Sequence, residues 1–254
     1  MQTIVLATQK GGSGKSTLAI GLALAAMQDG HNVRLIETDP QGTLSNWKRR
    51  RSDAEPSVEP VDGAGEIEQR LEIFGRNGVT LTVIDTAGGI SDVTTAAIRA
   101  ADLCLIPVRP SLVDLEAAAP TLRLARTCHT AFGFVLNQTP VRGQRLDKAS
   151  TALGDGAQLE AAGEAVAMPF IVMRNDHQDA LGSGLSVIEY APFGKSAEEI
   201  RGLWQWVSTK LGPVARADAQ GVVYDASAPA TVPAMYPVAD DSAIAPEEDV
   251  RDRH

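Results

Sequence analysis

One short stretch near the start of the chain constrains the fold more than any other. It is QKGGSGKST, from Gln9 to Thr17. The apolar run TIVLAT before it predicts a buried strand, and Leu18, Leu22 and Ala25 after it recur at helical spacing. A strand, a glycine-rich loop and a helix in this order direct free backbone N–H groups and the positive end of the helix dipole at one point. The stretch therefore predicts a phosphate-binding loop in an α/β fold.

The loop differs in two ways from the common pattern G-x-x-x-x-G-K-[ST]. Gln9 stands where the first glycine is expected, and a second lysine, Lys10, lies inside the loop. Lys15 is expected to contact the β- and γ-phosphates, Ser16 to bind Mg²⁺ and Thr17 to donate to the α-phosphate. The predicted nucleotide-binding residues of the loop are Lys10, Gly11, Gly12, Ser13, Gly14, Lys15, Ser16 and Thr17.

Two carboxylates at the ends of apolar runs complete the predicted site. Asp85 ends LTVID, a Walker B arrangement in which the acid holds Mg²⁺ through water. Asp39 ends VRLIETD and is expected to orient the attacking water, with a water-mediated contact to Mg²⁺ as an additional role. From these residues alone, the predicted catalytic residues are Lys15 and Asp39. The residues expected to respond to the γ-phosphate are Asp39, Pro40, Gln41, Asp85, Thr86 and Gly88.

Apolar runs alternate with helical patterns along most of the chain. This alternation predicts a three-layer α/β fold, with a mostly parallel β-sheet between helices and functional loops at the carboxyl ends of the strands. The expected strands are residues 3–8, 33–38, 81–86, 103–108, 132–137 and 168–173. The clearest expected helices are residues 16–28, 92–101, 112–127 and 196–211. We expect one domain over residues 1–212.

The end of the chain, residues 213–254, has a different composition. It mixes alanine, proline and acidic residues without periodicity, which predicts a disordered acidic tail. The net charge of the whole chain is -9, so no overall basic excess indicates nucleic-acid binding. A local basic patch remains compatible with it, because affinity for phosphates depends on where the cations lie.

Targeting signals and cysteines are the remaining compositional features. The apolar runs are far shorter than the ~20 residues that span a bilayer, and the chain opens on a strand-like run rather than a secretory signal. Cys104 lies in an apolar run, Cys128 follows a helical pattern, and neither belongs to a CxxC pair. These features predict a protein of the reducing cytoplasm.

Taken together, these motifs resemble those of the ParA/MinD branch of P-loop ATPases. Its deviant Walker A motif, K-G-G-x-G-K-[ST], is matched from Lys10 to Ser16. Its D-x-D-P-Q segment is matched from Glu37 to Gln41, with glutamate in place of the first aspartate. Its Walker B motif is similar to residues 83–86, but the prolines that often follow it are replaced by Ala-Gly-Gly. The resemblance covers residues 1–212 and is greatest to small ParA-type partition and positioning ATPases.

The resemblance implies an ATP- and Mg²⁺-dependent homodimer in which two subunits enclose two nucleotides. Lys10 would then be a third catalytic residue, because it would reach the nucleotide of the partner subunit, and Asn137 would contact the adenine. Relatives of this type bind nucleoid DNA without sequence preference, and a ParB-like or cargo-adaptor partner stimulates their slow hydrolysis. We therefore expect a cytoplasmic, nucleoid-associated protein that segregates or positions a plasmid, a chromosome or a protein cargo.

Several assignments remain open from the sequence. The candidates for DNA contacts are Arg174, Lys195, Arg201 and Lys210, with the KRRR run of residues 48–51 as another, although each could lie on a solvated helix face. The alternative within the family is a MinD-like membrane-associated ATPase. An apolar stripe at Ile200, Leu203, Trp204, Val207 and Leu211 would suit it, but an internal stripe is more typical of core packing. A nucleotide-locked scaffold without turnover is the non-enzyme alternative.

Overall fold

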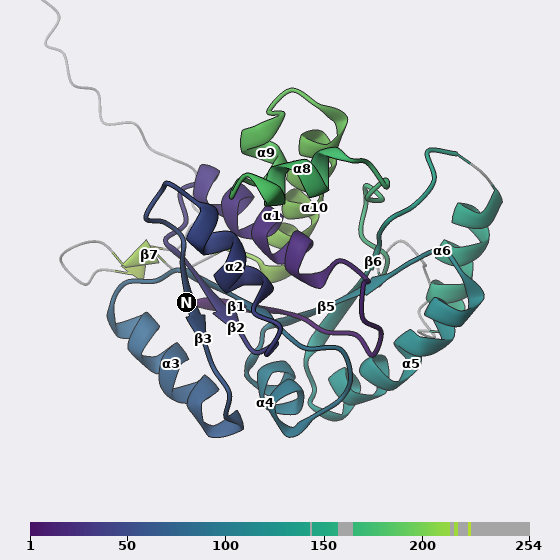
Figure 1. Ribbon diagram of the computed structural model, residues 1–254. Helices are drawn as coiled ribbons and strands as arrows, with labels where there is room; N and C mark the ends of the chain where they lie inside the picture. The colour runs from purple at the N-terminus through teal and green to yellow at the C-terminus, as the bar shows by residue number, and fades with distance from the viewer. Residues whose placement is uncertain (143, 157–164, 214–215, 218–222, 225–254) are drawn as a thin grey trace, which may run out of the picture. The chain divides into compact units, whose positions relative to one another are not determined.

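The structure is a computed structural model that describes residues 1–142, 144–156, 165–213, 216–217 and 223–224 (Figure 1). The chain divides into two units, Met1–Val214 and Ala215–His254. In the second unit, β7 (Arg216–Ala217) pairs antiparallel with β8 (Val223–Tyr224). The rest of the predicted acidic tail beyond residue 213 lies outside the described residues.

A parallel sheet forms the centre of the first unit, as predicted. Its strand order is β3-β2-β4-β1-β5-β6, and each neighbouring pair is parallel. The strands are β1 (Gln2–Leu6), β2 (Val33–Glu37), β3 (Ser57–Pro60), β4 (Leu81–Asp85), β5 (Leu103–Val108) and β6 (Ala131–Leu136). The predicted three-layer α/β fold is therefore confirmed.

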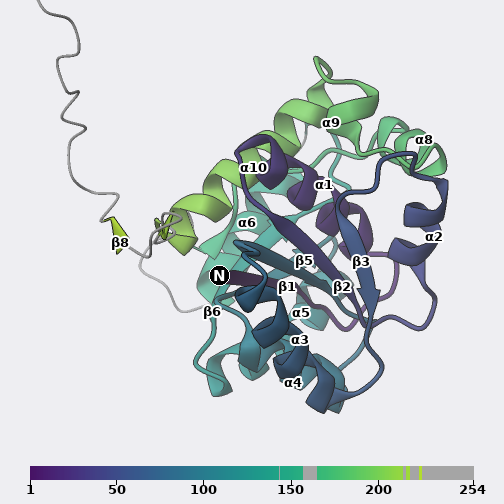
Figure 2. The same cartoon turned by 90° about the vertical axis from the view of Figure 1, so that its left-hand side faces the viewer.

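Helices cover both faces of this sheet (Figures 1 and 2). One layer consists of α1 (Lys15–Gln28), α2 (Thr43–Arg50), α8 (Asp176–Gly182), α9 (Val187–Tyr190) and α10 (Lys195–Leu211). The other consists of α3 (Ala64–Arg76), α4 (Asp92–Ala100), α5 (Leu112–Thr127) and α6 (Gln144–Gly156). The four helices expected from the sequence are found with bounds that agree within one residue.

The sheet separates two hydrophobic cores. Along β1, Ile4 and Leu6 face the core beneath α1 and α10, whereas Val5 faces the core of α3, α4 and α5. Every second side chain of a strand lies on the same face, so a strand between two helical layers must be apolar on both sides. This is why the central strands appear in the sequence as short continuous apolar runs.

Two features of the sheet differ from the sequence-based prediction. The stretch 168–173 was expected to be a strand, but it forms no named strand, and only Val172 makes an isolated bridge, to Thr139. Pro169 has no N–H group to donate, so a continuous ladder cannot run through this stretch. The edge strand β3 was not predicted, because its sequence SVEP is short and half polar.

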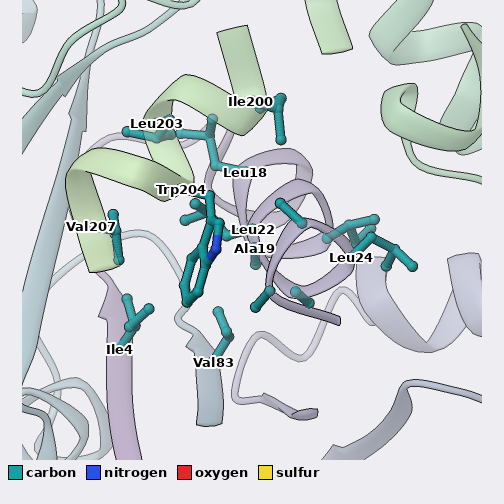
Figure 3. Close-up of a cluster of buried hydrophobic side chains, with 14 of the residues drawn as sticks. Ile4, Leu18, Ala19, Leu22, Leu24, Val83, Ile200, Leu203, Trp204 and Val207 are labelled. Carbon is teal, nitrogen blue, oxygen red and sulfur yellow. The ribbon is translucent and has the colours of Figure 1, made fainter. Parts of the chain in front are cut away.

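The apolar stripe of α10 lies in the core. Ile200, Leu203, Trp204 and Val207 are buried, while Leu211 is partly buried. Figure 3 shows the four buried side chains of the stripe between α10 and α1, with Ile4 of β1 and Val83 of β4 beneath them. Core packing, one of the two interpretations of the stripe, is therefore correct. Within the described residues, no helix is both long and apolar enough to cross a membrane.

We predict that Ile200→Ala lowers the free energy of unfolding by about 2–5 kcal/mol, because it opens a cavity in a packed core. Ile200 is completely buried and lies against Gly21 of α1, where even one added carbon would be crowded. Urea unfolding measures the change. Gln205→Ala, on the exposed side of the same helix, serves as the control and should stay within about 0.5 kcal/mol. Equal losses in both variants would contradict this packing.

Candidate functional site

The parallel register brings the predicted functional loops to one edge of the sheet. Leu6 of β1 and Glu37 of β2 both align with Asp85 of β4. The segments that follow these three strands therefore leave the sheet at the same level. They are the phosphate loop, the segment of Asp39 and the segment of Gly88, and they meet above the carboxyl ends of the strands.

These segments line a cavity of about 590 Å³. Most of the predicted loop and switch residues contribute to it, and Thr43, Gln9 and Ala87 join them. The lining consists of Gln9, Gly11, Gly12, Gly14, Lys15, Ser16, Thr17, Asp39, Pro40, Gln41, Thr43, Ala87 and Gly88. The cavity thus contains the groups expected for phosphates, for Mg²⁺ and for an attacking water.

The backbone of the loop has the shape that its glycines allow. Gly14 has a φ of 89°, in the left-handed region, and immediately precedes α1. A side chain at this position would collide with the amide of Asn137. Gly88 lies so close to the loop that an added carbon would come within 3.3 Å of the Gly11 nitrogen. The segment after β4 is therefore in direct contact with the phosphate loop.

Asp85 is completely buried beneath this cavity. Neither of its carboxylate oxygens has a hydrogen-bond partner among the described residues. Burial raises the pKa of Asp85 to about 7. The Ser16 hydroxyl and the Lys15 ammonium oppose this rise, although neither forms a hydrogen bond of good geometry with the carboxylate.

A divalent cation fits this arrangement. A buried acceptor without a donor is costly, and a hard cation held by oxygen ligands would remove that cost. Asp85 and the Ser16 hydroxyl are the protein groups that would hold Mg²⁺, with phosphate oxygens and water completing its shell. Among the described residues, no cluster of three or more His, Cys, Asp or Glu could hold a metal ion.

Lys15 extends into the same buried environment. Its residue is 6% exposed, and burial lowers the pKa of its ammonium, while Asp85 and Asp39 act to raise it. A buried ammonium at the N-terminus of α1 has an unfavourable position unless an anion is present. The loop therefore favours a phosphate group next to Lys15.

The structure does not place every predicted switch residue in the cavity. Thr86 is buried, and its hydroxyl donates a 2.8 Å hydrogen bond to the Leu6 carbonyl. It ties β4 to β1 instead of lining the cavity. Asp39 does line it, and one carboxylate oxygen accepts a 2.9 Å hydrogen bond from the Gln41 N–H. Asp39 is thus held in a turn within its own segment.

Glu37 has a role that the sequence did not reveal. Its buried carboxylate accepts hydrogen bonds from the N–H groups of Leu44 (2.6 Å) and Ser45 (3.1 Å) and from the Ser45 hydroxyl. The first N–H groups of a helix have no partner within the helix, and no capping side chain precedes α2. Glu37 therefore caps α2 from the neighbouring strand and fixes the segment that carries Asp39.

Asn137 lies beside the loop, next to a smaller cavity of about 130 Å³. Its amide donates a 2.7 Å hydrogen bond to the Ser13 carbonyl. Gln138 was not predicted, and it donates a 2.9 Å hydrogen bond to the Gly12 carbonyl. The small cavity shares Gly14 and Thr17 with the large one. This continuity is compatible with a base beside the phosphates, the place expected for adenine.

Lys10 is absent from the lining of the large cavity, although its neighbours Gln9 and Gly11 belong to it. Its ammonium lies 3.3 Å from a carboxylate oxygen of Asp114, in the first turn of α5. Of the two lysines of the loop, Lys15 therefore lines the cavity, whereas Lys10 is not part of its lining and is paired with Asp114.

The four candidate DNA contacts differ in their surroundings. Arg174 forms a 2.7 Å ion pair with Glu199, and Lys195 forms a 2.8 Å ion pair with Glu198. Within the described residues, Arg201 and Lys210 form no ion pair; Arg201 donates to the Pro192 carbonyl, and Lys210 lies over the Trp206 ring. The charges of Arg201 and Lys210 are therefore not paired with a carboxylate at ion-pair distance among the described residues.

The KRRR run is heterogeneous in the structure. Arg51 is buried and forms hydrogen bonds of 2.9 and 2.8 Å with the Glu189 carboxylate, so it joins α2 to α9. Lys48 and Arg50 donate to backbone carbonyls, and Arg49 donates to the Asn46 side chain. The first three residues of the run form a basic helix end, and the fourth belongs to the interior.

Comparison with known proteins identifies the family. Residues 4–220 match the family described as the CobQ/CobB/MinD/ParA nucleotide binding domain. The chain belongs to this family. The resemblance to ParA/MinD P-loop ATPases inferred from the sequence is therefore confirmed.

Individual members of the family are similar over most of their length. Maintenance of carboxysome distribution protein A from Gloeobacter kilaueensis is 30% identical, over 83% of this chain and 94% of the relative. The chromosome-partitioning ATPase Soj of Thermus thermophilus is 27% identical, over 83% and 97%. The structure of apo McdA from Cyanothece has a TM-score of 0.68 at 21% identity, over 84% and 100%, and shares the P-loop fold.

We predict that the buried carboxylate of Asp85 makes the nucleotide-free protein less stable as the pH rises. The pKa is about 7 in the folded chain, against an ordinary value of 3.8 for a solvated aspartate, so the native state binds the proton more tightly. The free energy of unfolding should then fall by about 1.4 kcal/mol per pH unit between about pH 4 and pH 7. Urea unfolding between pH 4 and pH 8 measures this slope.

Asp85→Asn should remove that contribution and stabilise the nucleotide-free protein at pH 8, while it abolishes the Mg²⁺-dependent part of nucleotide stabilisation. Glu68→Gln, an exposed change on α3, is the control and should keep the wild-type pH profile. An unchanged profile in Asp85→Asn would show that Asp85 does not titrate in this range.

Proposed function

We propose that this family member is an ATPase that dimerises around Mg²⁺-ATP and uses hydrolysis to position or segregate a cargo. The observation that carries the proposal is the shared cavity. It contains the phosphate loop, Asp39 of the segment after β2 and Gly88 of the segment after β4, with the buried Asp85 beneath it. A γ-phosphate in this cavity would touch both segments, so its loss on hydrolysis would release both.

The reaction needs positioning and charge stabilisation more than covalent chemistry. The loop N–H groups and Lys15 would bind the phosphates, Asp85 and Ser16 would hold Mg²⁺, and Asp39 would orient the attacking water. Mg²⁺ would supply neutralisation of the charge that develops on the phosphates. Lys10 does not line its own cavity and is paired with Asp114, which supports an action on the nucleotide of a second subunit.

The relatives indicate the class of cargo process. One of them maintains carboxysome distribution, and another is a chromosome-partitioning ATPase. We propose that the ATP-bound dimer binds DNA without sequence preference and that a ParB-like or adaptor protein stimulates its slow turnover. The protein would then be cytoplasmic and nucleoid-associated. Residues 1–212 would form the ATPase domain and residues 213–254 a tail.

The apolar stripe of α10 does not support the alternative of a MinD-like membrane protein. The apolar residues of α10 that would enter a lipid surface are packed against α1 (Figure 3). The proposal of a DNA-bound dimer therefore has more support in this chain.

We predict that Asp39→Ala slows ATP hydrolysis by about 10²–10⁴-fold and traps an ATP-bound dimer, because the water loses its orienting group while the phosphate site stays intact. Phosphate release and size-exclusion chromatography with ATP and Mg²⁺ measure the two effects. Glu68→Ala, which removes an exposed carboxylate of α3, is the control and should turn over like the wild type. A variant that stays monomeric with ATP would refute the sandwich dimer.

DNA retention should require ATP and weaken steeply as salt rises, because cations displace counterions from phosphates. Lys210→Gln should lower the slope of log affinity against log salt by about 1 per contact. Arg99→Gln removes an exposed charge on α4, in the opposite helical layer, and should leave the slope unchanged. Retention without ATP, or equal slopes in wild type and Lys210→Gln, would argue against this DNA surface.

A further inference from the structure

The ion pair between Lys10 and Asp114 has no role in the nucleotide site described above. Asp114 is part of neither cavity described above, and no sequence motif indicated it. The contact follows from the topology. β5 lies beside β1 in the sheet, so the segment after β5 runs next to the phosphate loop that follows β1. The first turn of α5 begins in that segment, and Asp114 is its third residue.

Both carboxylate oxygens of Asp114 accept hydrogen bonds from groups other than Lys10. One carboxylate oxygen accepts two hydrogen bonds from Arg109, at 3.1 and 3.0 Å, and the other accepts one from the Ser111 hydroxyl. Although burial acts to raise it, the pKa of Asp114 is lowered overall by Ser111, Arg109 and Lys10. Its side chain is 7% exposed, but a departing Lys10 would not leave it unpaired.

Lys10, by contrast, is only partly buried. Its side chain is 35% exposed, and Asp114 is its acidic partner within the described part of the chain. The pair therefore joins a buried carboxylate, which two other side chains also hold, to a partly exposed ammonium. An ion pair this exposed contributes at most about 1 kcal/mol, so ordinary phosphate charge is sufficient to open it.

We infer that Asp114 is a positioning residue for Lys10: it holds the ammonium outside the subunit's own cavity until the phosphates of a second subunit replace the carboxylate. The inference rests on the proposed function, because it assumes that Lys10 acts across a dimer. Each subunit then exchanges one ion pair for another when the dimer forms. Asp114 thereby opposes dimerisation weakly and reversibly, and it withholds Lys10 from the nucleotide bound in the same subunit.

The first test measures Lys10 in the nucleotide-free protein, where dimerisation plays no part. The full chain is treated with an amine-acetylating reagent, and mass spectrometry follows modification of Lys10. Asp114→Asn removes the negative charge but keeps one side-chain oxygen to accept from Arg109, while the Ser111 hydroxyl can accept from the new amide. This change should raise the rate at Lys10 by about two- to fivefold. Glu116→Gln, an exposed change two residues further along α5, should leave this rate unchanged.

The second test links Asp114 to dimerisation through Lys10. With ATP and Mg²⁺, Asp114→Asn should tighten the dimer by about two- to fivefold per subunit, as measured by analytical ultracentrifugation. The same change in a Lys10→Gln background should have no effect. Thermal unfolding of each variant shows whether it is folded.

The outcomes separate the two ideas. Equal acetylation of Lys10 in wild type and Asp114→Asn overturns the inference, and so does tightening that persists without Lys10. If the wild type stays monomeric with ATP, the proposed function fails. Faster acetylation in Asp114→Asn would then still show that the carboxylate holds Lys10, while the exchange between subunits would be refuted.

Discussion

The common level at which β1, β2 and β4 end is the constraint on which the rest of the structure depends. Leu6, Glu37 and Asp85 align across three parallel strands. A shift of one residue in any strand would turn its side chains to the opposite face. Asp85 would then leave the position beneath the phosphate loop, and Glu37 would no longer reach the N-terminus of α2. The two hydrophobic cores, which require the same alternation, thus also determine the geometry of the site.

The nucleotide-free site contains two buried charged groups whose burial is unfavourable. Asp85 and Lys15 are both buried; the carboxylate of Asp85 has no hydrogen-bond partner among the described residues, and burial lowers the pKa of the Lys15 ammonium. A cation for the first and phosphates for the second would remove the cost together. Binding of a metal-nucleotide complex would therefore be favoured over binding of either part, since each charge compensates a different residue.

The same loop carries a second cation with a different environment. Lys15 is buried in a cavity, whereas Lys10 is partly exposed and paired with a carboxylate of another helix. A buried charge tunes affinity, and an exposed charge can be transferred between partners at small cost. The two lysines are five residues apart in the chain. Lys15 is suited to binding the phosphates of its own subunit, and Lys10 is suited to responding to a nucleotide bound by a second subunit.

The sequence by itself determined the fold class and indicated the phosphate loop and the acids Asp39 and Asp85. Hydrophobic periodicity and glycine spacing are local properties, so they can be read from one segment without knowing its neighbours in the fold. The sequence could not show that Glu37 caps α2, that Thr86 bonds to Leu6, that Arg51 is buried against Glu189 or that Lys10 meets Asp114. Except for Glu37, these partners lie far apart in the chain. Only the tertiary structure decided them, because the free energy of a charge or hydroxyl depends on which distant segment packs beside it.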